Sequence, residues 1–101
     1  MGSRDDLHRI LLGFNNNKNI YYQPPATKKM EYPAISYDLN NIKAIHASNK
    51  KYLQFNEYVL TIMDVNPESE LVTKVLELPH SSFDRKFKSN NLNHTVIKLY
   101  Y

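Results

Sequence analysis

The fold is decided by residues 58–78, which read YVLTIMDVNPESELVTKVLEL. Residues 58–63 are β-branched, aromatic or aliphatic on both alternating faces, which predicts a central strand covered on both sides. Asn66 is a good helix N-cap, Pro67 suits the first helical position, and apolar residues then recur at helical spacing. Pro79 ends that helix. This stretch therefore predicts a strand, a short turn and a helix.

Hydrophobic periodicity outside this stretch predicts one further helix and four further strands. Ser3 is the expected N-cap of the first helix, and Gly13 with the asparagines after it is the expected end. Residues 89–91 are expected to connect the last two strands as a hairpin. The four strands are residues 19–23, 34–39, 82–88 and 92–101.

These elements predict one α+β domain over residues 1–101. Its sheet is small, four- to five-stranded and mainly antiparallel, and it is flanked by two helices in the order α-β-β-β-α-β-β. A chain of this length buries roughly 60–70% of its unfolded surface, which is enough for one modest core.

Two segments fit neither the helical nor the strand periodicity of apolar residues. Residues 40–52 are either an extended arm protruding between two long strands or a solvated loop, and they form the most basic part of the chain. Residues 23–29 contain two consecutive prolines and are expected to form an exposed extended loop.

Composition sets limits on the function. The net charge of +3 permits nucleic-acid binding but is too small to argue for it. The chain has no cysteine, so neither a disulfide nor a thiolate metal site can form. No apolar run approaches the roughly 20 residues of a membrane span, and we expect no membrane partner.

Residue patterns for catalysis are missing from the sequence. The four histidines show no ligand spacing, and the two glycines form no phosphate-binding loop. The neighbouring acids Asp64, Glu68 and Glu70 are explained by helix capping and the helix dipole. We therefore expect a protein that is not an enzyme and has neither a cofactor nor a metal.

Six short stretches are considered together: residues 7–12, Tyr22-Gln23-Pro24-Pro25, residues 32–37, residues 64–69, residues 92–94 and residues 99–101. Together they resemble small neck and tail-completion proteins of long-tailed bacteriophages of Gram-positive hosts, most closely the tail terminator family. The resemblance implies a structural protein with a small antiparallel or mixed sheet flanked by helices. Such proteins form a ring, commonly six-fold, on the finished tail tube, where they stop tube growth and dock the head connector.

The resemblance also implies partners and a location. The expected partners are copies of the chain itself, the major tail tube protein, a head-tail connector or stopper protein, and genomic DNA passing through the lumen. The expected location is the neck of the virion, with the host cytoplasm during assembly. The alternatives are another head-tail joining or stopper neck protein, for which two real helices are less typical, and a small nucleic-acid-binding module.

Residue-level expectations concern the two polar segments. A ring requires one surface patch to match a different patch on the next copy. The length and polarity of residues 40–52 and 23–29 make them the candidate contacts with other subunits or the tube. The candidate contact residues are Lys28, Lys29, Lys43, His46, Lys50, Lys51 and Tyr52, of which Lys43, Lys50 and Lys51 are also the candidates for facing DNA in the lumen.

Overall fold

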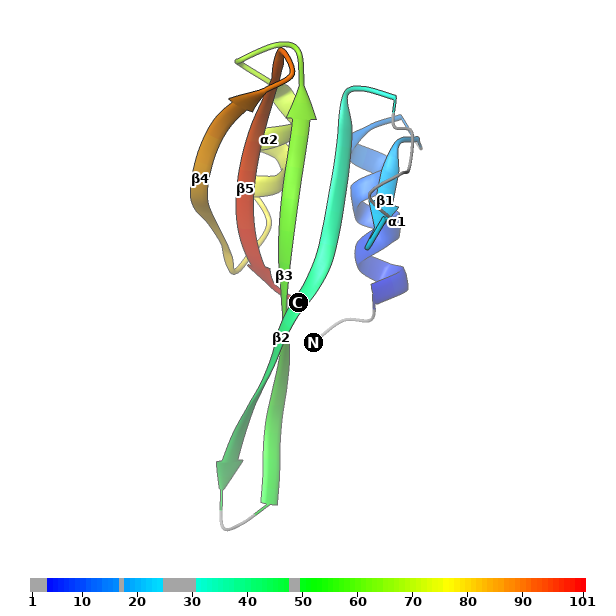
Figure 1. The fold of residues 1–101 in the computed structure, drawn as a ribbon. Coiled ribbons are helices and arrows are strands. Elements are labelled where there is room, and N and C mark those ends of the chain that lie inside the picture. Colours follow the sequence, from blue (N-terminus) through cyan, green and yellow to red (C-terminus); the bar gives the residue numbers. More distant parts are fainter. Residues whose placement is uncertain (1–3, 17, 25–30, 48–49) are drawn as a thin grey trace.

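The computed structural model of the 101-residue chain describes residues 4–16, 18–24, 31–47 and 50–101, with the backbone alone at residues 43–47 and 50–55. The described residues form two helices and five strands in the predicted α-β-β-β-α-β-β order (Figure 1). The elements are α1 (Arg4–Phe14), β1 (Ile20–Tyr22), β2 (Ala34–Ala47), β3 (Lys50–Asp64), α2 (Glu70–Leu76), β4 (Ser81–Ser89) and β5 (Leu92–Tyr100).

All five strands belong to one mixed sheet in the order β1-β2-β3-β5-β4. β1 pairs with β2 in parallel, and every other neighbouring pair is antiparallel. One row across the sheet joins Tyr37, Leu60, Ile97 and Phe83 as successive partners. The predicted α+β class with a mainly antiparallel sheet is confirmed.

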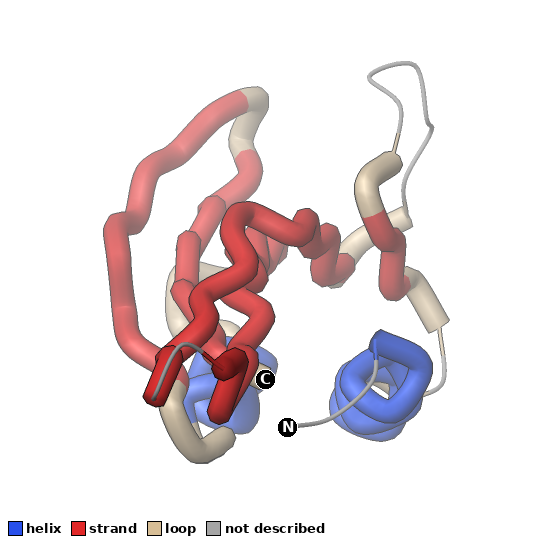
Figure 2. Tube along the Cα trace, turned by 90° about the horizontal axis from the view of Figure 1, so that it is seen from below, coloured by secondary structure: helices blue, strands red, loops and turns tan. Residues whose placement is uncertain are grey.

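Both helices pack on the same face of the sheet, as the view along the strands shows (Figure 2). The core lies between them and the sheet. It contains Leu7 and Leu11 of α1, Val75 of α2, and residues such as Leu60 and Ile97 of the central strands. The apolar stripes of both helices therefore pack against the same face of the sheet.

The prediction that β3 is covered on both faces is wrong, because both helices cover the same face. Tyr58 and Leu60 are buried beneath the helices, whereas Val59 and Thr61, which alternate with them, are only half-buried. Met63 is nevertheless buried on this second face. An apolar strand sequence could not show that the two helices would choose the same side, because the strand is apolar on both.

The helix α2 begins later than its cap signal indicates. Its N-cap is Ser69, and Asn66 lies in the turn before it. Asn66 donates its backbone N–H to Asp64 Oδ1 (3.0 Å), and Glu68 donates its own to Asn66 Oδ1 (3.0 Å). These local bonds hold a non-helical turn, because Asp and Asn side chains compete with the backbone for helix bonds.

The other boundaries lie within a few residues of prediction. α1 continues through Gly13 and ends at Phe14, and Asn16 (φ 55°) takes the left-handed conformation common after a helix. The expected cap Ser3 lies outside the described residues. Asn90 and Asn91, with φ of 52° and 63°, form the predicted hairpin turn between β4 and β5.

Candidate functional site

The most distinctive feature is the length of the β2–β3 hairpin. The strands have 14 and 15 residues, although the sequence predicts strand at only residues 34–39 and 58–63 of them. β1 pairs with residues 35–37 of β2, and β5 pairs with residues 57–64 of β3. The hairpin therefore continues beyond its neighbours, and the molecule measures 51 × 24 × 22 Å (Figure 1).

We call the outer part of this hairpin, residues 40–47 and 50–56, the arm. The rest of the described chain is the body. The strands of the arm pair with each other as far as Ala47 and Lys50. The register shifts twice, between Leu39 and Asn41 and between Ile45 and His46. Each shift interrupts the two-residue alternation, which explains why periodicity did not extend the strands into this segment.

A buried carboxylate anchors the arm where it leaves the body. Glu57 is buried, and its Oε2 accepts a hydrogen bond from Asn40 Nδ2 (3.3 Å). Its Oε1 accepts one from Tyr100 Oη (3.5 Å) on β5. The backbone of Asn56 and that of Tyr101 also bond to each other, with Tyr101 N–H donating to Asn56 O at 2.9 Å. These bonds join β2 to β3 at the base of the arm and tie that base to β5.

An aromatic cluster lies on the body side of this base. Tyr37 is fully buried, and its hydroxyl lies 2.6 Å from His8 Nδ1 on α1. Its ring contacts those of Tyr22 and Tyr58, with centroids 4.9 and 6.0 Å apart. Burial raises the pKa of Tyr37 and of Tyr58 above the usual 10.0, so both phenols are neutral near pH 7. The cluster joins α1 to the sheet next to the arm.

Charge is unevenly divided along the chain. Residues 23–29 and 40–52 contain five lysines and no acidic residue. The rest of the chain has eight basic and ten acidic residues, a net charge of −2. The arm is therefore attached to a body of the opposite formal charge.

The predicted contact residues fall in three places. Lys28 and Lys29 lie outside the described residues. Lys43, on β2, has Phe55 as its strand partner. The others lie at the far end of the arm, where His46 is opposite Lys51, Lys50 is opposite Ala47, and Tyr52 falls at the second register shift.

Sequence reasoning missed the anchor of the arm. Glu57, Asn40 and Tyr100 are distant in sequence and meet only through the strand order β2-β3-β5. One signal was available, since Glu57 directly precedes an apolar strand segment and a buried carboxylate requires donors.

No model of a protein family matches the chain, and comparison with curated proteins finds no match either. Among the described residues, no group of three or more His, Asp or Glu side chains is placed to hold a metal ion. Neither described helix has the length and apolar composition that a membrane span requires.

Proposed function

We propose that this chain is a structural virion protein, a tail terminator that forms a ring from its own copies, caps the tail tube and joins it to the head connector. The arm is the observation that carries the proposal. The resemblance of the sequence to tail terminators supplies the type of ring and its partners, and the α+β fold with two helices agrees with that resemblance.

The arm needs a surface to rest on. A two-stranded ribbon alone is at best marginally stable in water. Ile42, at the start of the arm, is 53% exposed, and no other described strand pairs with either strand of the arm beyond its base. A neighbouring copy that accepts the arm would cover this ribbon, and repeating that contact through a closing rotation makes a ring.

Charge supports a contact between the arm and the next body. The arm carries Lys43, Lys50 and Lys51, whereas the chain outside the two lysine-rich segments has a net charge of −2. Complementary charge guides association and fixes orientation more than it adds affinity. The proposed ring should therefore assemble more slowly as salt increases.

The first experiment measures assembly in solution. We expect rings at high protein concentration, detected by native mass spectrometry and by negative-stain electron microscopy. Ile42→Asp should disperse them, because it buries a charge in the proposed contact. Val65→Asp is the matched control, since Val65 is 70% exposed in the turn before α2. A wild-type protein that stays monomeric at millimolar concentration, or equal assembly of both variants, contradicts the proposal.

The lysines of the arm also test the role of DNA. If Lys43, Lys50 and Lys51 face the lumen of the ring, reversing their charges should leave the ring intact and impair passage or retention of DNA. If they seat the arm on the next body, the same reversal should disperse the ring. Strong, salt-sensitive binding of the monomer to oligo(dT) would instead favour a nucleic-acid-binding module.

A further inference from the structure

The two edges of the sheet differ in how much backbone they present. β1 is an edge of three residues, and β4 is an edge of nine. Every residue of β4 after Ser81 is exposed, including Phe83 (55%) and Phe87 (43%). β4 pairs with β5 on one side and with no other described strand. A long exposed edge with apolar side chains is a template for another strand.

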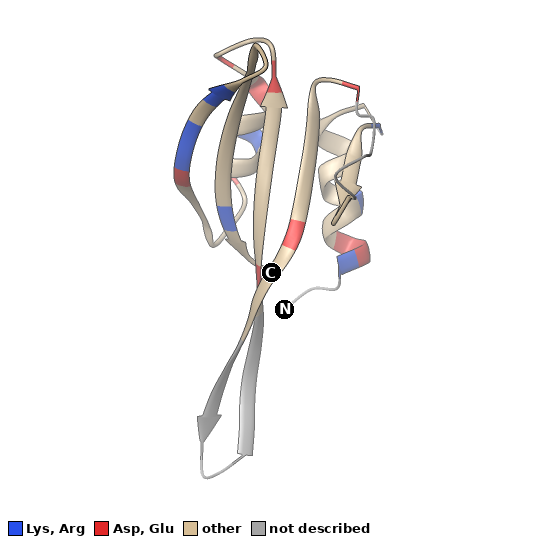
Figure 3. Cartoon of the chain, in the orientation of Figure 1, with Lys and Arg blue, Asp and Glu red and all other residues tan. Residues whose placement is uncertain are grey.

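The charge on β4 indicates which kind of strand could be added to this edge. The edge carries Arg85, Lys86 and Lys88 against a single acid, Asp84, which forms an ion pair with Arg85 (2.7 Å) and leaves Lys86 and Lys88 in excess. Lys98 on β5 is the strand partner of Ser82. Figure 3 shows Lys and Arg positions, in blue, along β4, the outer strand of the sheet. Because opposite charges stabilise directly opposed strand positions and like charges destabilise them, the added strand should be acidic.

A second copy of this chain is a poor occupant. Two β4 strands paired antiparallel about a two-fold axis place the central residue opposite itself. A centre at Asp84, Arg85, Lys86 or Lys88 therefore opposes identical charges, and a centre at Phe87 opposes Lys86 with Lys88. A centre at Phe83 avoids like charges but pairs only residues 81–85 of the nine, and centres nearer either end of β4 pair fewer still. The arm contains three lysines and no acid over residues 40–52, so it is no better matched.

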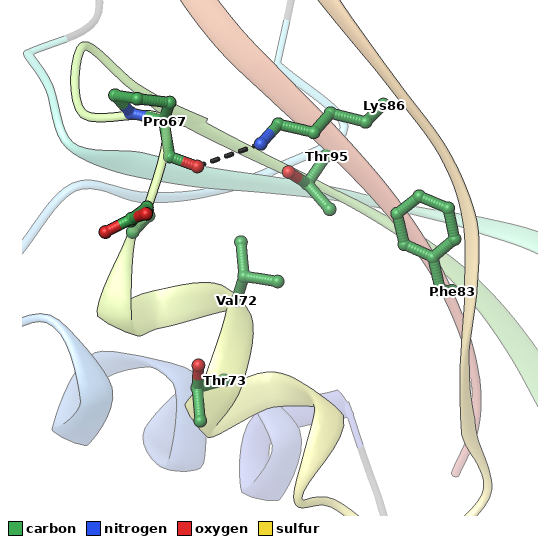
Figure 4. A pocket seen from close by; sticks show the side chains of 8 residues that line it. Pro67, Val72, Thr73, Phe83, Lys86 and Thr95 are labelled. Atoms are coloured by element: carbon green, nitrogen blue, oxygen red, sulfur yellow. Dashed lines mark hydrogen bonds between the residues drawn. The ribbon is translucent and has the colours of Figure 1, made fainter.

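A groove of about 290 Å³ lies beneath this edge, between β4 and α2. Val72 of α2 and Phe83 of β4 line its apolar part, and Thr95 lines it from β5 (Figure 4). Lys86 lies at the same groove, with its Nζ donating to Pro67 O at 2.8 Å. A strand added to β4 would place every second side chain over this groove.

We propose that β4 is a strand-addition site for an extended acidic segment of a different protein. Backbone bonds along Ser81–Ser89 supply affinity, and alternate side chains supply specificity. An apolar side chain opposite Phe83 enters the groove, and acidic side chains lie opposite Lys86 and Lys88. The site needs only one folded copy of the chain, so this proposal can be tested independently of the proposed ring.

The test uses synthetic nine-residue peptides with Val, Ile or Phe at the position opposite Phe83 and Glu at the positions opposite Lys86 and Lys88. We expect at least one to bind by fluorescence anisotropy and to protect the amides of β4, but not those of β1, from hydrogen exchange. Lys88→Glu should weaken binding about fivefold or more, whereas Lys18→Glu, an equal charge change on an exposed residue far from β4, should not. Peptides with Lys in place of Glu should not bind.

Four results would overturn the proposal. One is the absence of binding by every acidic peptide at millimolar concentration to a protein shown to be folded by circular dichroism. Another is binding that protects amides elsewhere and leaves β4 unchanged. The third is equal weakening by Lys88→Glu and Lys18→Glu, which would indicate a general response to charge. The fourth is binding of oligo(dT) to β4 in preference to the acidic peptides, which would assign the same edge to nucleic acid.

Discussion

The body and the arm share the two strands β2 and β3, yet different forces hold them. In the body, β3 lies between β2 and β5 and is covered by both helices, so Leu60 and Ile62 are almost completely buried. In the arm the same strands have only each other as described neighbours. Burial of apolar surface is the dominant favourable term in folding. Changes in the body should therefore alter the stability of the fold, and changes in the arm should alter assembly.

The largest effect should come from the centre of the body. Leu60→Ala removes a fully buried side chain whose partners on the neighbouring strands are Tyr37 and Ile97. We expect it to lower the free energy of unfolding by about 2–5 kcal/mol. Ile42→Ala is the paired change in the arm and should cost less than about 0.5 kcal/mol in the monomer. Urea unfolding followed by circular dichroism measures both. Equal losses would remove the distinction between body and arm.

The boundary between the two regions gives the next effect. Glu57→Ala removes the carboxylate to which the Asn40 amide and the Tyr100 hydroxyl donate, and because hydrogen bonds to a charged group are the stronger ones, we expect a loss of about 1–3 kcal/mol. The arm should also exchange its amide hydrogens faster, while the amides of α1 change less. Glu57→Gln retains one acceptor and should lie between Glu57→Ala and the wild type. An arm that exchanges at the wild-type rate in Glu57→Ala would show that the anchor does not hold it.

The sequence predicts the body better than the arm for a physical reason. In the body, burial imposes the alternation that makes Tyr58, Leu60 and Ile62 readable as one face. In the arm, two register shifts break the alternation and nothing described in the same chain imposes a buried face. Prediction is limited within the body too, as Asn66 shows. It is a residue type that favours helix N-caps, but its side chain accepts a hydrogen bond within the turn before the helix. The anchor at Glu57 depends on strand order, which local pattern does not contain.

A smaller effect comes from the aromatic cluster that joins α1 to the body. Burial raises the pKa of Tyr37 above its usual 10.0, so the unfolded chain loses the phenolic proton first as the pH rises. The contribution of Tyr37 to the free energy of unfolding should therefore be constant up to about pH 10 and fall above it. Tyr37→Phe should cost about 0.5–1.5 kcal/mol at pH 7 through the lost His8 contact and should flatten the alkaline decline.

Unfolding by urea at several pH values measures this slope. Tyr32→Phe is the control, because Tyr32 is 44% exposed and lies outside the aromatic cluster. The same alkaline slope in Tyr37→Phe and in the wild type would show that the buried phenol is not its source.

The smallest effect on stability should come from removing most of the arm. Lys43 and Phe55 are strand partners, so an Asn-Gly pair in place of residues 44–54 closes the hairpin with a favoured two-residue turn. The anchor at Glu57 and the whole core remain, and we expect the free energy of unfolding to change by less than about 0.5 kcal/mol. The same variant should form no rings in the electron microscope, because it keeps only residues 40–43, 55 and 56 of the proposed contact. Rings of wild-type size from the shortened chain would show that the body alone assembles, whereas a large loss of stability would show that the arm belongs to the fold.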